Sequence, residues 1–251
     1  MALGLPAVIR ACLFDLDGVI TDTASVHAAA WKEAFDAFLQ QRGGDGFHPF
    51  TADTDYREFV DGRPRADGVR CFLSSRGIEL PDGSPDDPPG LDTVHGLGRW
   101  KNGLFEARIR SQGAEVYRDT MAYLMAARDQ GLLTAVVTSS ANCREILRAA
   151  RAETLFDAWI DGVVAASRDL RGKPHPDTFL AAARDLGQHP AQCAVFEDAQ
   201  AGMDAGRSGH FGWVVGVDRT GQADALYAHG ADAVVKDLRD LAGTPDRRPR
   251  P

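Results

Sequence analysis

Short apolar runs alternate with longer amphipathic stretches along much of the chain. The apolar runs have the length of strands, and the stretches between them are rich in Ala, Leu and Arg and often close on Gly, as helices do. The expected strands are Val8–Phe14, Leu132–Thr138, Ala158–Ile160, Ala194–Phe196, Trp213–Val217 and Ala233–Val235. The expected helices are Asp119–Gln130, Asn142–Ala150, Pro176–Leu186 and Ala199–Ser208. This alternation predicts an α/β fold, a Rossmann-like doubly wound parallel sheet covered on both faces.

The region after the first strand departs from this alternation. Its candidate helices have no buried strand between them, and they are Ser25–Gln41, Ala66–Arg76 and Arg99–Gln112. The stretch Pro81–Gly90 is rich in Pro, Asp and Gly and predicts a loop. We therefore expect an all-helical cap domain at residues 25–103, inserted into a core domain of residues 1–24 and 104–243. The tail at 244–251 is predicted to be disordered.

Composition narrows the class of protein without indicating its chemistry. The chain has 251 residues, 44% of them hydrophobic, which is enough for one large α/β domain or for a core and a smaller domain. A net charge of −8 argues against general binding of nucleic acid or anionic membranes, and no apolar run reaches the length of a membrane span. The four cysteines are widely spaced, without a Cys-x-x-Cys pair. This spacing argues against a zinc site or a disulfide framework and favours the cytoplasm.

Two carboxylates follow the first apolar run. Asp15 and Asp17 come directly after Phe14 and are separated by one residue. At period two, both side chains leave a strand on the same side, so one metal ion can bridge them. Two unpaired carboxylates this close would be costly, which makes a divalent cation the natural third group. The alternative is a pair of turn-forming aspartates at a strand end.

Hydroxyl groups follow the second expected strand. Thr138, Ser139 and Ser140 combine side-chain hydroxyls with a turn of backbone N–H groups, and both suit the oxygens of a phosphate. The alternative is that Ser and Thr serve here as ordinary helix caps.

A lysine and a second pair of acids complete the polar groups near expected strand ends. Lys173 lies in a loop with Pro174 and Pro176, so it is either a positioned cation or a solvated surface lysine. Glu197 and Asp198 directly follow a buried run. Such a pair suits Mg²⁺, which prefers oxygen ligands, although acids are also common at helix N-termini.

The order of these groups along the chain resembles the haloacid dehalogenase superfamily. From Leu13 to Asp198 it runs Asp-x-Asp, then Thr/Ser, then Lys, then Glu-Asp. Members of that superfamily transfer phosphoryl groups through an aspartyl phosphate, on a core of the fold expected here.

Further residues are similar to the β-phosphoglucomutase-like family, over most of residues 7–218. They are Asp15–Thr23 with His27 and Trp31, Lys173–Pro174 and Glu197–Gly202. The resemblance implies interconversion of β-D-glucose 1-phosphate and D-glucose 6-phosphate, with Mg²⁺ and a bisphosphate intermediate. The alternative is a Mg²⁺-dependent phosphatase of the same superfamily that acts on a sugar phosphate or another small phosphomonoester.

The resemblance also implies roles for the core residues. Asp15 would be the nucleophile and Asp17 the general acid and base, with Thr138 and Lys173 offsetting charge on the transferring phosphoryl group. The implied metal-binding residues are Asp15, Asp17, Glu197 and Asp198.

A mutase also needs a second anion site, which the resemblance places on the cap. Arg65 matches an arginine that grips phosphate, His27 a histidine coupled to Asp17, and Lys101 a lysine that contacts the sugar. The alternatives are that His27 is a structural or surface residue and that Lys101 is a solvated helix charge. The implied substrate-binding residues are His27, Gly62, Arg63, Arg65, Lys101, Ser139, Ser140 and Asn142. One departure is Asp61, which stands where the family has a lysine. The expected partner is a small sugar phosphate, and we expect a monomer.

Two other classes of function fit the sequence less well. A catalytically silent binding domain would have no reason to retain Asp15, Asp17, Lys173, Glu197 and Asp198 together. A nucleotide-binding Rossmann domain would carry a glycine-rich phosphate loop after its first strand, and this chain has Asp-Leu-Asp-Gly there.

Overall fold

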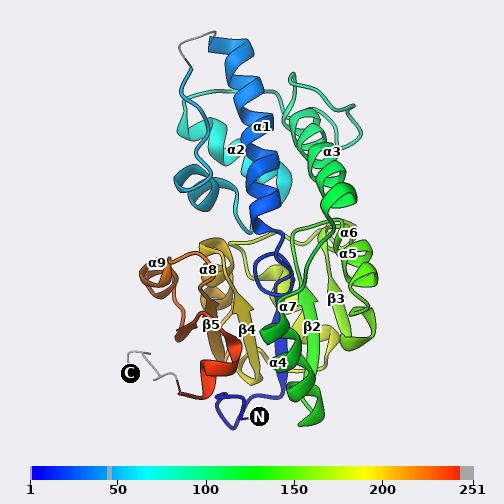
Figure 1. Ribbon diagram of the computed structural model, residues 1–251, viewed down its shortest axis with the longest axis vertical. Helices are drawn as coiled ribbons and strands as arrows, with labels where there is room; N and C mark the ends of the chain where they lie inside the picture. Colours follow the sequence, from blue (N-terminus) through cyan, green and yellow to red (C-terminus); the bar gives the residue numbers. More distant parts are fainter. Residues whose placement is uncertain (1, 44–46, 244–251) are drawn as a thin grey trace. The chain divides into compact units, whose positions relative to one another are not determined.

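The computed structural model describes residues 2–43 and 47–243, and the chain divides into two compact units (Figure 1). One unit comprises Met1–Asp22 and Glu115–Pro251, and we term it the α/β unit. The other, Thr23–Ala114, is termed the helical unit. The tail at 244–251 that was predicted to be disordered lies outside the described residues.

The α/β unit is built on a six-stranded parallel sheet with the order β3-β2-β1-β4-β5-β6. Its strands are β1 (Ala11–Phe14), β2 (Leu133–Val137), β3 (Ala158–Ile160), β4 (Cys193–Glu197), β5 (Trp213–Val217) and β6 (Ala233–Val235). In the central pairings, Phe14 of β1 lies opposite Val136 of β2 and Phe196 of β4. The strand order reverses direction at β1, so the carboxyl ends of β1, β2 and β4 flank a switch point, the usual ligand site of such sheets. This is the expected doubly wound fold.

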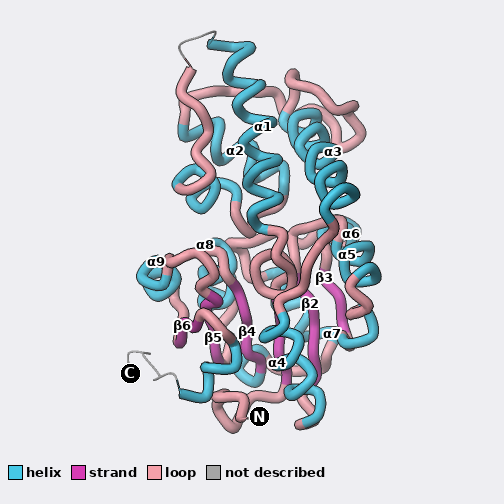
Figure 2. The backbone as a smooth tube through the Cα atoms, viewed as in Figure 1, coloured by secondary structure: helices cyan, strands magenta, loops and turns pink. Residues whose placement is uncertain are grey.

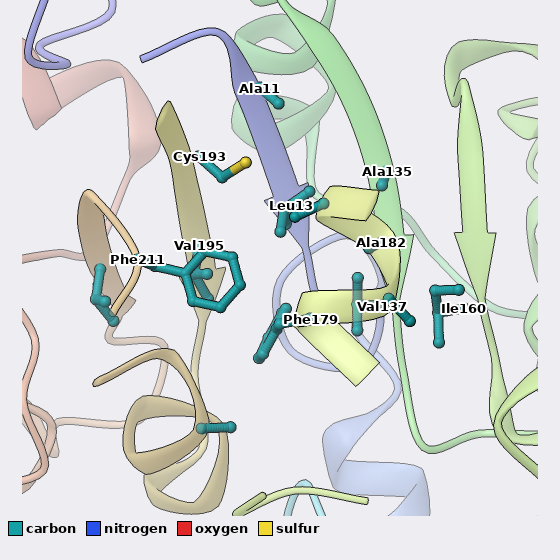
Figure 3. Close-up of a cluster of buried hydrophobic side chains, with 14 of the residues drawn as sticks. Ala11, Leu13, Ala135, Val137, Ile160, Phe179, Ala182, Cys193, Val195 and Phe211 are labelled. Atoms are coloured by element: carbon teal, nitrogen blue, oxygen red, sulfur yellow. The ribbon is translucent and has the colours of Figure 1, made fainter. Parts of the chain in front are cut away.

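Helices cover both faces of this sheet. The helices of the unit are α4 (Arg118–Asp129), α5 (Cys143–Ala149), α6 (Gly162–Ser167), α7 (Asp177–Asp185), α8 (Gln200–Ser208) and α9 (Ala223–Ala228), with the short turns η3 (Glu153–Leu155), η4 (Pro190–Gln192) and η5 (Leu238–Gly243). Figure 3 shows Leu13, Val137 and Val195 from three strands beside Phe179 and Ala182 of α7. Alternation along the strands sends Phe14 and Phe196 to the other face, where Phe196 meets Tyr123 of α4. Near-continuous apolar strands are what a sheet buried on both faces requires.

The helical unit has its own apolar core and, among its described residues, no strand (Figure 2). It consists of α1 (Ala24–Gly43), the π-helical turn η2 (Tyr56–Val60), α2 (Arg65–Ser75) and α3 (Val94–Gln112). Phe35 on α1 packs against Phe50 and Phe72, with ring centroids 5.1 and 4.2 Å away. A separate aromatic core explains why this insertion forms a compact unit of its own.

The elements agree with the sequence-based expectations more closely than the predicted boundary between the units does. All six expected strands form, and the stretch Pro81–Gly90 contains no helix or strand. The return to the core was expected at residue 104, but that position lies inside α3, and the units divide after Ala114. The physical reason is a pairing within the α/β unit: the Asp22 N–H donates to the Glu115 carbonyl at 2.9 Å, and Thr21 forms a β-bridge with Val116.

Candidate active site

The centre of the α/β unit is a buried ammonium between two carboxylates. Lys173 Nζ lies 2.5 Å from Asp15 Oδ1 and 2.5 Å from Glu197 Oε1, and it also donates to the Val137 carbonyl at 3.1 Å. These partners stand at the carboxyl ends of β1, β4 and β2, whereas Lys173 comes from the loop before α7. The lysine is 1% exposed. The alternative of a solvated surface lysine is therefore wrong.

Burial and charge act against each other in this group. Burial raises the pKa of the Asp15 carboxyl well above its usual range; the Lys173 ammonium opposes this shift and Glu197 adds to it. For Lys173, burial favours the neutral amine, but the charges of Asp15 and Glu197 outweigh it and raise the pKa of the lysine. Lys173 is therefore a cation at neutral pH, held beside the carboxylate that the sequence analysis expects to react.

Three carboxylates of this group can hold a metal ion. One oxygen from each of Asp15, Glu197 and Asp198 lies within 4.8 Å of the others, and all three residues are buried. With one ammonium among them, the ionised group carries two more negative than positive charges, an excess that a divalent cation offsets. Oxygen-only ligands of this kind suit Mg²⁺. The donor set thus fits the expected metal.

The backbone after β1 is shaped around these carboxylates. β1 ends at Phe14, so Asp15 and Asp17 lie beyond the strand, although the Asp15 N–H still donates to the Phe196 carbonyl at 2.9 Å. Asp17 is not a member of the three-carboxylate group among the described residues, although its charge adds to the rise in the Asp15 pKa. Gly18 has a positive φ of 82°, and a Cβ there would collide with the Asp198 carboxylate. Glycine is required at this close approach.

The turn after β2, which carries the hydroxyl groups, is held by hydrogen bonds between its own residues. Thr138 is buried, and its Oγ1 accepts a hydrogen bond from the Ser140 N–H at 3.1 Å. Ser140 Oγ in turn accepts from the Asn142 N–H at 3.2 Å. The backbone carbonyl of Ser140 accepts from the Gly162 N–H at 3.0 Å. The turn therefore brings the expected phosphate-contacting residues together at the end of β2. Ser139 belongs to the same turn.

Two residues near the acids were missed by the sequence analysis. Gln222 donates its Nε2 to the Asp198 carbonyl at 2.9 Å, and its own N–H is bound by Asp218 Oδ1 at 2.7 Å. Asp218 follows β5 directly, so it carries the same strand-end signal that identified Asp15. Gln222 begins a short helix and had no such signal.

The helical unit contains a buried lysine among aromatic rings. Lys101 Nζ lies 2.6 Å from His27 Nδ1 and 4.8 Å from the centroid of the Trp31 ring. His27 stacks on Phe105 with ring centroids 3.9 Å apart. Lys101 is 3% exposed, which excludes the alternative of a solvated helix charge.

A second polar group of the helical unit contains Arg65. Its NH2 donates to Asn102 Oδ1 at 2.8 Å, and Asn102 Nδ2 donates to Glu106 Oε1 at 2.6 Å. Gly62 and Arg63 precede α2 in a turn, where the Arg63 N–H reaches the Val60 carbonyl at 3.3 Å. The departure from the family, Asp61, begins this turn, and its N–H donates to the Tyr56 carbonyl at 2.9 Å. Glu106 was not identified from the sequence.

A family model described as haloacid dehalogenase-like hydrolase matches residues 9–210. The chain belongs to that family, with the parallel sheet and strand-end acids described above. It is therefore an enzyme of phosphoryl transfer, and the superfamily resemblance drawn from the sequence is confirmed.

The relatives narrow the family further. A Mycobacterium bovis protein named β-phosphoglucomutase is 52% identical over 245 residues, which cover 95% of this chain and 94% of the relative. The Bacillus subtilis protein of that name is 32% identical over 234 residues, covering 93% and 92%. A crystal structure of β-phosphoglucomutase from Clostridium difficile has a TM-score of 0.70 at 26% identity and covers 93% of each chain. The chain belongs to the β-phosphoglucomutase-like family.

None of the helices within residues 2–43 and 47–243 is both long enough and apolar enough to cross a membrane.

Proposed function

We propose that this chain interconverts β-D-glucose 1-phosphate and D-glucose 6-phosphate through an aspartyl phosphate and a bisphosphate intermediate. Relatives that carry the name β-phosphoglucomutase align over nearly the whole chain, at up to 52% identity. The observation that carries the proposal is the buried Asp15–Lys173–Glu197 group. It sets a carboxylate beside a fixed cation at the carboxyl edge of the sheet, as phosphoryl transfer to a carboxylate requires.

Asp15 is the nucleophile in this proposal. Its carboxylate oxygen forms a bond to phosphorus while the bond between phosphorus and the sugar oxygen breaks. Asp17 gives a proton to the departing sugar oxygen and later removes one from the hydroxyl that attacks the phosphoenzyme. Lys173 and the Thr138 turn offset negative charge on the phosphoryl oxygens.

The metal of the proposal is Mg²⁺. Asp15 and Asp198 would hold it, with Glu197 beside them. The resemblance to the family adds the Asp17 backbone carbonyl as a further ligand. When bound, Mg²⁺ supplies positive charge that stabilises the phosphoryl oxygens. Glu197 has a second task, because its Oε1 accepts from Lys173 and its Oε2 accepts from the Ala199 N–H at 2.8 Å. It fixes the lysine as well as contributing charge.

The helical unit supplies the second anion site in this proposal. Arg65 binds the phosphate that is not being transferred, since a guanidinium suits bidentate phosphate recognition. Lys101 and His27 contact the sugar and its reacting hydroxyl, and Gly62 and Arg63 also contact the substrate. Ser139, Ser140 and Asn142 bind phosphate in the α/β unit. The cytoplasmic location and the monomeric state stay predictions.

One assay tests the function. With β-glucose 1-phosphate, Mg²⁺ and a β-glucose 1,6-bisphosphate primer, we expect glucose 6-phosphate to form far faster than free phosphate. Chelation of the metal should abolish turnover and added Mg²⁺ should restore it. Stoichiometric release of phosphate without glucose 6-phosphate would instead establish the phosphatase alternative.

A further inference from the structure

A row of residues on α3 supports Arg65. Gly98, Asn102 and Glu106 are spaced by four residues, so they lie on one face of the helix. The Arg65 stem packs on Gly98, where an added Cβ would stand 3.0 Å from Arg65 Cδ and 3.1 Å from Cγ. The guanidinium then reaches Asn102 one turn further along, and Asn102 reaches Glu106 in the next turn. All four residues belong to the helical unit.

The chemistry of Glu106 determines which way the Asn102 amide points. An ionised carboxylate only accepts hydrogen bonds, so the Asn102 side chain must present its NH2 group to Glu106 Oε1. The carbonyl oxygen Oδ1 is then left to face Arg65, where it accepts at 2.8 Å. In the opposite orientation, the NH2 group would point at the donors of the guanidinium and no hydrogen bond would form. The orientation of the amide therefore depends on Glu106.

The negative charge of Glu106 also affects the pKa of Arg65. Burial lowers the pKa of the Arg65 guanidinium, and the negative charge of Glu106 opposes this shift. The positive charge of Arg99 also lowers the pKa of Arg65. Arg99 itself is bound by the loop before α3, where its Nε donates to the Pro85 carbonyl at 3.0 Å and its guanidinium pairs with Asp86. The side chain that accepts from Arg65 is a neutral amide, so this contact does not cancel the positive charge of the guanidinium.

We propose that Glu106 is a positioning residue, which orients the Asn102 amide so that its oxygen holds Arg65 in place for a substrate phosphate. This inference rests on the proposed role of Arg65 in the mutase reaction. Glu106 itself touches Asn102 and, on its outer side, lies 3.7 Å from Arg110. One hydrogen bond to Asn102 uses only part of the five-donor guanidinium, which leaves N–H groups to engage an anion.

The test is a binding series in an enzyme that does not turn over. In an Asp15→Asn background, calorimetry with Mg²⁺ measures the affinity for β-glucose 1,6-bisphosphate, which needs both anion sites. We expect Glu106→Lys to weaken binding by about 30-fold or more, because a lysine turns the Asn102 amide around, and Glu106→Ala by about 10-fold. Glu106→Gln retains an acceptor and should bind within about threefold of the parent. Arg110→Gln, which removes only the outer ion pair, is the matched control and should bind as the parent does.

The reference variant Arg65→Ala separates the two ways in which the inference can fail. If Arg65→Ala weakens binding while Glu106→Lys and Glu106→Ala do not, the role of Glu106 is overturned and the proposed function stands. If Arg65→Ala has no effect, the assignment of Arg65 is wrong and the role of Glu106 falls with it. A loss in Glu106→Gln as large as in Glu106→Lys would also overturn the inference, because orientation of the amide would then not be the cause.

A kinetic measurement distinguishes positioning from damage to the fold. In the Asp15-containing enzyme, Glu106→Ala should raise the KM for β-glucose 1-phosphate. Its hydrolysis of p-nitrophenyl phosphate, which carries no second anion, should stay within about twofold of the parent. An equal fall in both activities, together with a lower thermal midpoint, would show a structural role and contradict the proposal.

Discussion

The two units hold their cations in different ways. In the α/β unit, Lys173 is in contact with two carboxylates and is 1% exposed, so its charge is used inside the protein. In the helical unit, Arg65 donates to the oxygen of a neutral amide, that of Asn102. The carboxylate of Glu106 accepts from the NH2 group of the same amide. Lys101 in that unit meets an imidazole nitrogen and the face of Trp31.

This difference corresponds to two roles that cations have in phosphoryl transfer. A cation that must stay fixed beside the nucleophile is stabilised by permanent counter-charges, because an unpaired buried ammonium would be costly. A cation that must bind and release an anion is oriented by neutral groups, so that the anion meets a charge that is not already cancelled. We therefore expect substitutions in the α/β unit to affect all phosphoryl chemistry and stability, and those in the helical unit to affect sugar-phosphate chemistry selectively.

The largest expected effect is at Asp15. Asp15→Asn replaces the proposed nucleophile with an amide of the same size, and we expect both isomerisation and hydrolysis of p-nitrophenyl phosphate to fall by about 10⁴-fold or more. Steady-state assays of both reactions check this. The control is Asp129→Asn, the same change at an exposed position of the same unit. Activity within tenfold of the parent would exclude the covalent mechanism.

The next effect is on stability at Lys173. Lys173→Met leaves Asp15 and Glu197 buried without their cation, and we expect a loss of about 3–5 kcal/mol in the free energy of unfolding at neutral pH without metal. Urea denaturation measures it. Lys236→Met, the same change at an exposed lysine, should cost less than about 0.5 kcal/mol. Equal effects of the two substitutions would mean that the buried ion pairs do not contribute.

The pH dependence of this contribution follows from the sign of the lysine shift. The pKa of Lys173 is raised in the folded protein by Asp15 and Glu197, against the effect of burial. Its stabilising contribution is therefore fully present below the unfolded pKa of about 10.4 and is lost as the pH rises through the higher folded value. The difference in stability between the parent and Lys173→Met should accordingly persist at neutral pH and shrink in strongly alkaline solution, where the ammonium loses its proton.

The smallest effect, and the most selective, is expected at Lys101. Lys101→Met keeps the apolar stem that packs near Trp31 but removes the donor, so kcat/KM for β-glucose 1-phosphate should fall roughly 10- to 100-fold. Hydrolysis of p-nitrophenyl phosphate should change by less than about threefold. Lys32→Met, which replaces an exposed lysine that pairs with Asp36 and donates to the Phe50 carbonyl, is the control. A parallel loss of both activities would remove the distinction between the units.

Much of the fold was predictable because its signals are local. The strands β3, β5 and β6 form with the expected bounds, since short apolar runs between glycines and charged residues carry a clear pattern. The helix α6 was missed, and it contains no buried residue that would create an amphipathic pattern. The start of α3 was placed too late, at Arg99, because Gly96 and Gly98 weaken a helical pattern. The Arg65 stem packs closely on Gly98, a contact that the local sequence does not reveal.

Some residues of the candidate site were likewise predictable from the sequence and others were not. Asp15, Glu197 and Asp198 were found from the sequence because they end or directly follow buried apolar runs and their order matches the haloacid dehalogenase pattern. Their oxygens come together once β1 and β4 align in parallel, because both strands then end at the same edge of the sheet. Gln222 and Glu106 were not found, since each acts on a neighbour that is close only in the folded chain.

By itself, the sequence determined which residue types stand at the strand ends, and through them the family and the class of reaction. Only the tertiary structure decided which of these groups pair. Lys173 reaches Asp15 across 158 positions of the chain and Arg65 reaches Asn102 across 37. The physical reason is range: backbone patterning depends on neighbours a few residues apart, whereas a buried charge is compensated by whatever the packing of distant segments brings within hydrogen-bonding distance.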